Sequence, residues 1–371
     1  MNETRTVRAD ALIASLETAG VVTPEQTAAI TADFAAVRPG DDPPLYLKIL
    51  SAVGTAFATA FFLAFLGVSG LIDFNSGAAT MVWGAVFLAG GLGLAAKARG
   101  GPIGLAGDVT AQSAFTALAI GKVLVVIGAM AHFGGGTPWV ATIALAVVTV
   151  VTYPLSGSSL DRLLSPYAVA ASILWELLER HGGTVSPSLA VTVYFVAATA
   201  IAAALLTSAR VSGTWRPLGL AALGAMGTVV CIIATGHDFG LWSNGRPLDP
   251  RPIEAVLTLA LIGLIGWAAG GADRLADERL LPAVVGVAAL GFAAAPGIVF
   301  ALGLLILGHA RHDRPIQVVG ILALPAFLVM WYWARDLTFL TKSAVLVASG
   351  AALLGARIWM RLRGFDRETT T

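Results

Sequence analysis

Residues 331–363, WYWARDLTFLTKSAVLVASGAALLGARIWMRLR, contain the parts of one membrane crossing in order. An aromatic triplet is followed by a short polar link, and an apolar run from Ser343 to Ile358 then ends among arginines. Aromatic side chains gather at both interfaces of a bilayer, and arginine is enriched in the loops on its cytoplasmic side. The stretch therefore predicts a transmembrane helix, and with it a membrane protein.

The composition supports the same class. The chain has 371 residues, of which 57% are hydrophobic and 12% are charged, whereas soluble domains are about 45–50% apolar and about 25% charged. This number of charged residues is too small to cover a water-exposed surface. Lipid must therefore be the solvent. A net charge of +1 offers no basic field for nucleic acid, and the single Cys231 excludes both a disulfide framework and a thiolate metal site.

Apolar segments recur from Leu45 onward, many of them with the roughly 20 residues that a helix needs to cross a bilayer. Short charged or Gly/Pro-rich links separate them. The sequence therefore predicts an all-α, polytopic transmembrane bundle over 45–371, with about 12 membrane segments and a short basic C-terminal tail. The predicted segments are 46–70, 77–96, 111–131, 138–156, 162–179, 188–208, 215–236, 252–270, 281–295, 297–310, 315–334 and 341–360.

Three of these segments are short. The apolar part of 162–179 is limited, and 281–295 and 297–310 are each below spanning length. Pro296 and Gly297 separate the last two and are a candidate helix break. Two interpretations stay open for this region: a pair of tilted helices, or a re-entrant hairpin buried in protein.

Residues 1–44 are polar enough to lie outside the membrane and carry no signal-peptide pattern. A first short helix ends at Gly20, which suits a left-handed cap. Thr23 then serves as the N-cap of a second helix, with Pro24 at its first position and Gln26 three residues after the cap. We expect a small cytosolic helical hairpin and linker, either packed on the membrane domain or docking a partner.

The basic residues predict an orientation. With a cytoplasmic N-terminus and all twelve segments counted, 17 of the 23 lysines and arginines fall inside and five outside, as the positive-inside rule expects. Merging 281–310 into one crossing would place the arginine-rich C-terminus outside, so this region should return the chain to the side it came from. Both termini are then cytoplasmic. The scarcity of lysine and the abundance of Arg, Ala, Gly and Val favour a bacterial source, and hence the cytoplasmic (inner) membrane.

The remaining basic residue, Lys122, falls almost at the centre of 111–131, about 15 Å of helix from either end. A charge at that depth costs about 2.5–3.5 kcal/mol on insertion scales, so it normally faces a cavity or a partner. No other predicted span carries a carboxylate near its middle. Lys122 is thus either a packing lysine beside Gly121 or a candidate intramembrane polar site that faces an anion or a partner.

Catalytic signatures are missing from the sequence. It contains no His-Glu-x-x-His zinc helix, no Gly-x-Ser-x-Gly elbow and no phosphate-binding P-loop. His309 and His312 have the spacing of a metal-binding helix face, but they lie among arginines and fit a solvated basic loop better. We therefore predict no catalytic residue, no cofactor and no metal, and an enzyme is not the favoured class.

Three stretches carry a family resemblance: Pro44-Leu45-Tyr46-Leu47-Lys48, Ala294-Ala295-Pro296-Gly297-Ile298, and the tail that begins at Trp331. On these residues the chain resembles an uncharacterised bacterial membrane family named for domain of unknown function 4401. Members of that family are often encoded beside a membrane-anchored protein named for a GDYXXLXY motif. The resemblance implies a two-component membrane assembly but no activity or substrate.

Two functions follow as hypotheses. The first is a structural or interaction subunit that holds a membrane-anchored partner. The second is a secondary transporter or permease for a small solute, anions included, with Lys122 and the Pro296-Gly297 break near its pathway. The candidate partner-contact link comprises Trp331, Tyr332, Trp333, Arg335, Asp336 and Lys342.

Overall fold

The computed structural model describes residues 76–99, 105–134, 139–179, 186–208, 214–235, 249–271, 281–292 and 296–334, with scattered residues within 17–27, 54–70 and 340–347 and at 273. Across this part of the chain every element of regular structure is a helix, and no strand occurs. The predicted all-α class is confirmed for it. The predicted segments 46–70 and 341–360 and the predicted hairpin within 1–44 lie mostly outside the described residues.

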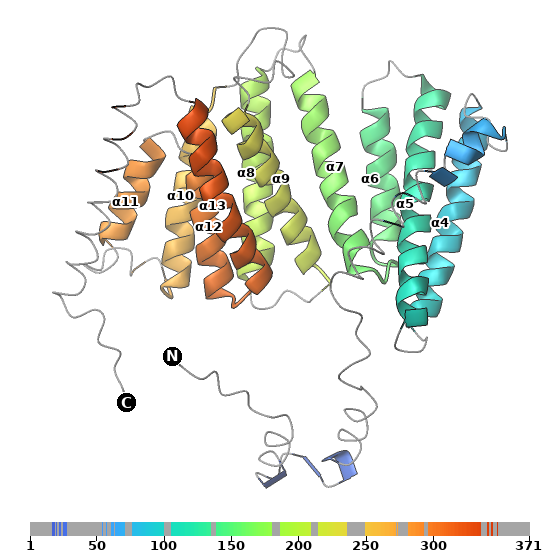
Figure 1. Ribbon diagram of the computed structural model, residues 1–371, viewed down its shortest axis with the longest axis horizontal. Helices are drawn as coiled ribbons and strands as arrows, with labels where there is room; N and C mark the ends of the chain where they lie inside the picture. Colours follow the sequence, from blue (N-terminus) through green and yellow to red (C-terminus); the bar gives the residue numbers. More distant parts are fainter. Residues whose placement is uncertain are drawn as a thin grey trace. The chain divides into compact units, whose positions relative to one another are not determined.

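Ten helices have described bounds and are labelled in Figure 1. They are α4 (Gly77–Arg99), α5 (Leu105–Phe133), α6 (Val140–Thr152), α7 (Ser159–Glu179), α8 (Pro187–Thr207), α9 (Arg216–Thr235), α10 (Arg251–Ala268), α11 (Leu281–Phe292), α12 (Pro296–Ala310) and α13 (Arg314–Ala334).

Within the part of the chain that the structure describes, five helical stretches are long and apolar enough to cross a membrane: α4, residues 109–133 of α5, α8, α9 and α10. Three shorter apolar stretches lie in α6, α12 and α13. Large apolar side chains such as Val150 and Leu322 are exposed on the helices, which suits lipid as the solvent. The chain is therefore a multi-pass integral membrane protein, while the total of about 12 segments stays a prediction.

Part of the N-terminal capping pattern can be followed. The Thr23 backbone N–H donates to Gln26 Oε1 at 3.1 Å, and the Gln26 backbone N–H donates to Thr23 Oγ1 at 3.3 Å. These two bonds form the reciprocal capping box expected from the sequence. Gly20 has a φ of 68°, the left-handed conformation that ends a helix without a Cβ clash.

The chain divides into two compact units, Met1–Gly128 with Leu155–Ser158, and Ala129–Pro154 with Ser159–Thr371. In the first unit, α4 packs closely against α5 through glycine. A Cβ on Gly84 would lie 2.9 Å from the Gly121 carbonyl oxygen, and a Cβ on Gly121 would lie 2.9 Å from the Gly84 carbonyl oxygen. A Cβ at either position would be too close to the facing backbone, and small residues of this kind let membrane helices approach closely.

The second unit holds the larger apolar core, to which α7 to α13 contribute. Its helices run alternately up and down, so that the ends of neighbouring helices meet. One end, here called the arginine end, joins the C-termini of α6, α8 and α12 to the N-termini of α7, α9 and α13. The contacts are Arg162 Nε to the Tyr153 carbonyl (3.3 Å), the Tyr153 hydroxyl to the Thr214 carbonyl (2.7 Å), Arg216 to Asp313, and Arg311 Nε to the Leu206 carbonyl (2.6 Å).

The other end of this unit is here called the opposite end. There the N-terminus of α6 meets the C-terminus of α7, and the N-terminus of α8 meets the N-terminus of α10. The Trp139 backbone N–H donates to Glu176 at 3.3 Å, and the Asp249 backbone N–H donates to Ser188 Oγ at 3.0 Å. The alternation predicted from the apolar segments is therefore present in α6 to α10.

Candidate functional site

Lys122 lies in α5 near the middle of its apolar stretch, and only 5% of its surface is exposed. Its neighbour Gly121 forms the close contact with α4 described above, and the nearby residues Ile120 and Leu124 are buried together with Leu66. Lys122 is thus enclosed by the protein rather than open to a wide vestibule. This position is compatible with a packing role and with a role in holding an internal group.

The candidate break at Pro296 and Gly297 falls at the start of α12, and three residues separate α12 from the end of α11. Both residues are buried. The ring of Phe327 on α13 fills the space that a Cβ on Gly297 would need. The residues therefore begin a helix and seat it closely against α13, and Figure 1 shows α12 and α13 side by side.

The predicted partner-contact link is described only at its beginning. Trp331, Tyr332 and Trp333 are among the last residues of α13, whereas Arg335, Asp336 and Lys342 lie outside the described residues. The Tyr332 and Trp333 rings meet edge to face with their centroids 6.3 Å apart. Trp333 is 76% exposed, so its indole is available to lipid or to another protein.

A polar seam between α6 and α7 escaped the sequence analysis. The buried residues of α6 are all threonines (Thr142, Thr149 and Thr152), and α7 buries Asp161 and Ser165. Threonine is compatible with most membrane helices, so the spacing alone did not reveal a polar face. We define the α6–α7 seam as these five residues together with Ser172, which lies on α7 opposite Thr142.

Two contacts determine the register of this seam. The hydroxyl oxygens of Thr142 and Ser172 are hydrogen-bonded at 2.6 Å. At the arginine end of the same two helices, Arg162 Nε donates to the Tyr153 carbonyl at 3.3 Å. In an antiparallel pair, that register places Thr149 at the level of Ser165. Ser165 in turn donates to the Asp161 carboxylate at 2.9 Å. Hydroxyls and a buried carboxylate therefore line α6 and α7 over most of their shared length.

Further hydrogen bonds tie α7 to α8 and α9. The Tyr167 hydroxyl lies 3.0 Å from Thr228 Oγ1 on α9, and the Tyr194 hydroxyl on α8 donates to the Ala170 carbonyl at 3.0 Å. Pro166 lies inside α7 and has no N–H to offer the Arg162 carbonyl. The most polar described helix of the second unit is thus linked by side-chain hydrogen bonds to α6, α8 and α9.

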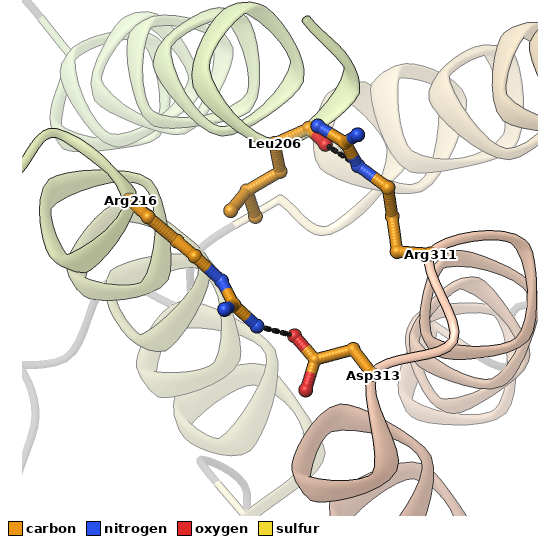
Figure 2. A network of polar contacts seen from close by, with 4 residues as sticks. All are labelled: Leu206, Arg216, Arg311 and Asp313. Carbon is orange, nitrogen blue, oxygen red and sulfur yellow. Dashed lines mark hydrogen bonds and ion pairs between the residues drawn. The ribbon is translucent and has the colours of Figure 1, made fainter. Parts of the chain in front are cut away.

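The arginine end contains a second polar network (Figure 2). Arg216, the first residue of α9, forms an ion pair with Asp313, which precedes α13. The side chain of Asp313 is 5% exposed and that of Arg216 is 56% exposed. The carboxylate is therefore drawn into the protein, while much of the guanidinium stays at the surface.

The turn that carries Asp313 is itself defined by the backbone. His312 has a φ of 52°, its N–H donates to the His309 carbonyl at 3.1 Å, and the Asp313 N–H donates to the Gly308 carbonyl at 2.8 Å. This pair of bonds is a Schellman motif, which satisfies the last carbonyls of α12. It turns the chain sharply into α13 and presents Asp313 to Arg216.

Arg311 binds the C-terminal end of α8. Its Nε donates to the Leu206 carbonyl at 2.6 Å and its Nη2 to the Ser208 carbonyl at 2.9 Å, and Figure 2 shows the first of these bonds. Its guanidinium also lies 5.8 Å from the ring centroid of Trp267 on α10. A cation at a helix C-terminus is favourable because it satisfies free carbonyls and opposes the helix dipole. Arg311 thus joins three helices.

The histidines near this turn show ring contact with each other. The His309 and His312 rings meet at an angle of 60° with their centroids 6.4 Å apart. Among the described residues no group of three or more His, Cys, Asp or Glu side chains is placed to hold a metal ion.

The family can now be assigned. The family model for a domain of unknown function, DUF4401, matches residues 44–363, which is most of the chain. The chain belongs to the DUF4401 family. No curated protein and no solved structure matches it. For this DUF4401 protein, the resemblance inferred from the aromatic tail and the Pro296-Gly297 stretch is therefore confirmed.

Proposed function

We propose that this DUF4401 protein is a structural or interaction subunit of a two-component bacterial membrane assembly, and that its partner is a membrane-anchored protein of the GDYXXLXY type. The observation that carries the proposal is Trp333, which is 76% exposed at the end of α13. Trp333 belongs to the predicted partner-contact link, which begins at Trp331. Tryptophan is enriched among residues that contribute most to binding, because it buries a large surface at little entropic cost.

The interior of the second unit supports a rigid scaffold. The hydroxyl groups of Thr142, Tyr167 and Tyr194 are each within 3.0 Å of an oxygen on a neighbouring helix. Such bonds hold adjacent helices at a set position in a membrane, each contributing about 0.6 kcal/mol on average. A scaffold needs this rigidity, because a partner binds best to a surface that is already ordered.

Orientation supports the choice of surface. Arg216 and Arg311 lie at the arginine end. The positive-inside rule therefore favours a cytoplasmic location for this end of the helices. Since α13 begins at that end beside Asp313, Trp333 lies at the opposite end and would face the outer side of the inner membrane. We therefore expect the partner to contact the protein there, with both termini of this chain in the cytoplasm.

Co-purification tests this proposal. The full chain is co-expressed with the GDYXXLXY-type protein and extracted in a mild detergent, and the two should elute together in fixed proportion. Trp333→Ala should release the partner. Trp175→Ala is the matched control, because Trp175 is also an exposed tryptophan, at 57%, on a helix that ends at the opposite end. Elution of the chain without the partner would contradict the proposal.

The α6–α7 seam favours a second candidate, a secondary transporter or permease for a small solute. Asp161 is 2% exposed within a seam of hydroxyl groups, and buried ionisable residues in membrane helices often belong to ion or proton pathways. Proteoliposomes should then show a solute-driven current that Asp161→Asn abolishes. Thr199→Val is the control, because the Thr199 hydroxyl bonds only within α8, to the Phe195 carbonyl at 2.8 Å. Identical currents in both variants would exclude the seam.

If the transported solute is an anion, Lys122 is the candidate contact. Lys122→Ala should then abolish binding of the anion while the protein is still made and inserted. Unchanged anion binding would assign Lys122 a packing role beside Gly121.

A further inference from the structure

We propose that the arginine end, where α8, α9, α12 and α13 meet, binds the phosphate headgroup of an anionic phospholipid. The inference is independent of the proposed partner, which would contact the opposite end. It starts from the network in Figure 2, which brings two arginines and a buried carboxylate from distant parts of the sequence to one surface.

The charge at this surface is unbalanced. Among the described residues at and just beyond the helix termini of the arginine end, the arginines are Arg162, Arg216, Arg311 and Arg314, and the carboxylates are Asp161, Asp273 and Asp313. Arg314 is exposed at the start of α13. Three carboxylates can neutralise three arginines, so one positive charge is left. Asp161 and Asp313 are buried, whereas Arg216, Arg311 and Arg314 are exposed. A surplus of this kind attracts the negatively charged headgroups of the inner leaflet.

The geometry directs that surplus outward. The side chain of Asp313 is buried, whereas 56% of the Arg216 side chain is exposed. The ion pair uses Nη2 of the guanidinium, and among the described residues no other bond of Arg216 is present, so its other N–H donors are available to an oxyanion. Arginine suits this task because its fork of donors matches the oxygens of a phosphate group.

The aromatic residues here indicate the depth of the site. Trp215 stacks on Tyr153 with their ring centroids 5.9 Å apart and the planes at 28°, and Trp267 lies against Arg311. Tryptophan and tyrosine prefer the headgroup level of a bilayer. The arginines beside them are therefore at the level of lipid phosphates, which favours a lipid over a phosphate ion in free solution.

The opposite end supplies a matched comparison. Arg251 begins α10 and is followed by Pro252, just as Arg216 and Arg314 begin their helices and are followed by proline. Asp249 and Glu254 flank Arg251 closely in sequence. Arg251 therefore shares the Arg-Pro pair at a helix start but has no surplus of positive charge around it. It is the control position.

Native mass spectrometry of the full chain in detergent tests the inference. The probe is phosphatidylglycerol, with phosphatidylcholine as the uncharged comparison and inorganic phosphate as a competitor. The wild-type protein should retain phosphatidylglycerol in preference to phosphatidylcholine. Arg314→Gln should weaken that binding about fivefold, the effect of removing one arginine near a charged membrane surface. Arg251→Gln should leave it unchanged.

Arg216→Gln alone leaves Asp313 buried without its partner and could impair folding. The double variant Arg216→Gln with Asp313→Asn removes both charges and keeps the site neutral, so it should fold and also bind the lipid more weakly. Equal binding of the two lipids, equal loss in the Arg251→Gln control, or full displacement by millimolar inorganic phosphate would each overturn the proposal. The last result would assign the site to a free phosphate ion.

Discussion

Gly84 on α4 and Gly121 on α5 face each other so closely that a Cβ on either residue would lie 2.9 Å from the carbonyl oxygen of the other. The contact is reciprocal and involves backbone on both sides, so no flexible side chain can yield to relieve it. It places Lys122, the only charged residue in the apolar part of α5, one residue from a close backbone approach of these two helices.

The first prediction concerns this contact. Gly84→Ala should lower the free energy of unfolding by about 1–3 kcal/mol, the cost of overpacking a filled interface. Gly90→Ala on the same helix is the control, because no atom of the described residues outside its own helix backbone lies within 4 Å of the position its Cβ would take. Alanine there should be neutral or gain up to about 1 kcal/mol from helix propensity. Thermal unfolding in detergent measures both, and equal stability of the two variants would contradict the described packing.

The second prediction uses two threonines of α6 that are seven residues apart. Thr142 shares a hydrogen bond with Ser172 at 2.6 Å, so Thr142→Val should cost about 1 kcal/mol. Thr149 is 6% exposed and its hydroxyl has no hydrogen-bond partner among the described residues. Thr149→Val should therefore be neutral or stabilising, because it removes an unsatisfied buried polar group. Unfolding midpoints in the reverse order would show that Thr149 binds a group absent from the structure.

The third prediction concerns the Arg216–Asp313 ion pair. Arg216→Met should destabilise the protein by about 1–3 kcal/mol because it leaves the buried carboxylate without its partner. Asp313→Asn should cost less, since Arg216 is largely exposed and remains solvated. A double-mutant cycle on thermal unfolding gives the coupling energy. Additive effects of the two substitutions would mean that the pair contributes nothing.

The fourth prediction concerns orientation. In a Cys231→Ser background, which removes the exposed native cysteine, we expect Ser186→Cys at the opposite end to react with a membrane-impermeant maleimide in intact cells. Thr214→Cys at the arginine end should react only after the cells are permeabilised. The reverse pattern would place the arginines outside and contradict the orientation.

Much of the helical architecture was accessible from sequence. The predicted segments 188–208, 215–236 and 252–270 agree with α8, α9 and α10 to within two residues at each end. These segments are long, and charged or Pro/Gly-rich links bound them, so length and polarity were sufficient. The segment 162–179 was harder to assign. Helix α7 begins earlier, at Ser159, and continues through Pro166, because its polar residues bond to neighbouring helices rather than to water.

The polar contacts were less accessible, for two physical reasons. In lipid the outward face of a helix is as apolar as the inward face or more so: α6 exposes Ile143, Val147 and Val150 and buries threonines. A search for the most apolar face therefore selects the lipid side. Arg216 and Arg311 are both among the 17 basic residues that the count places inside, but Asp313 lies 97 residues from Arg216. Only the folded structure shows that these two side chains are partners.

Site-specific crosslinking at Trp333 tests the proposed interaction role most directly. A photoreactive amino acid is introduced at position 333 in the full chain and, as the control, at position 175, and cells that also express the GDYXXLXY-type protein are irradiated. We predict a covalent product of the two proteins from position 333 and none from position 175. A product from neither position, or equal products from both, would contradict the account that the end of α13 holds the partner.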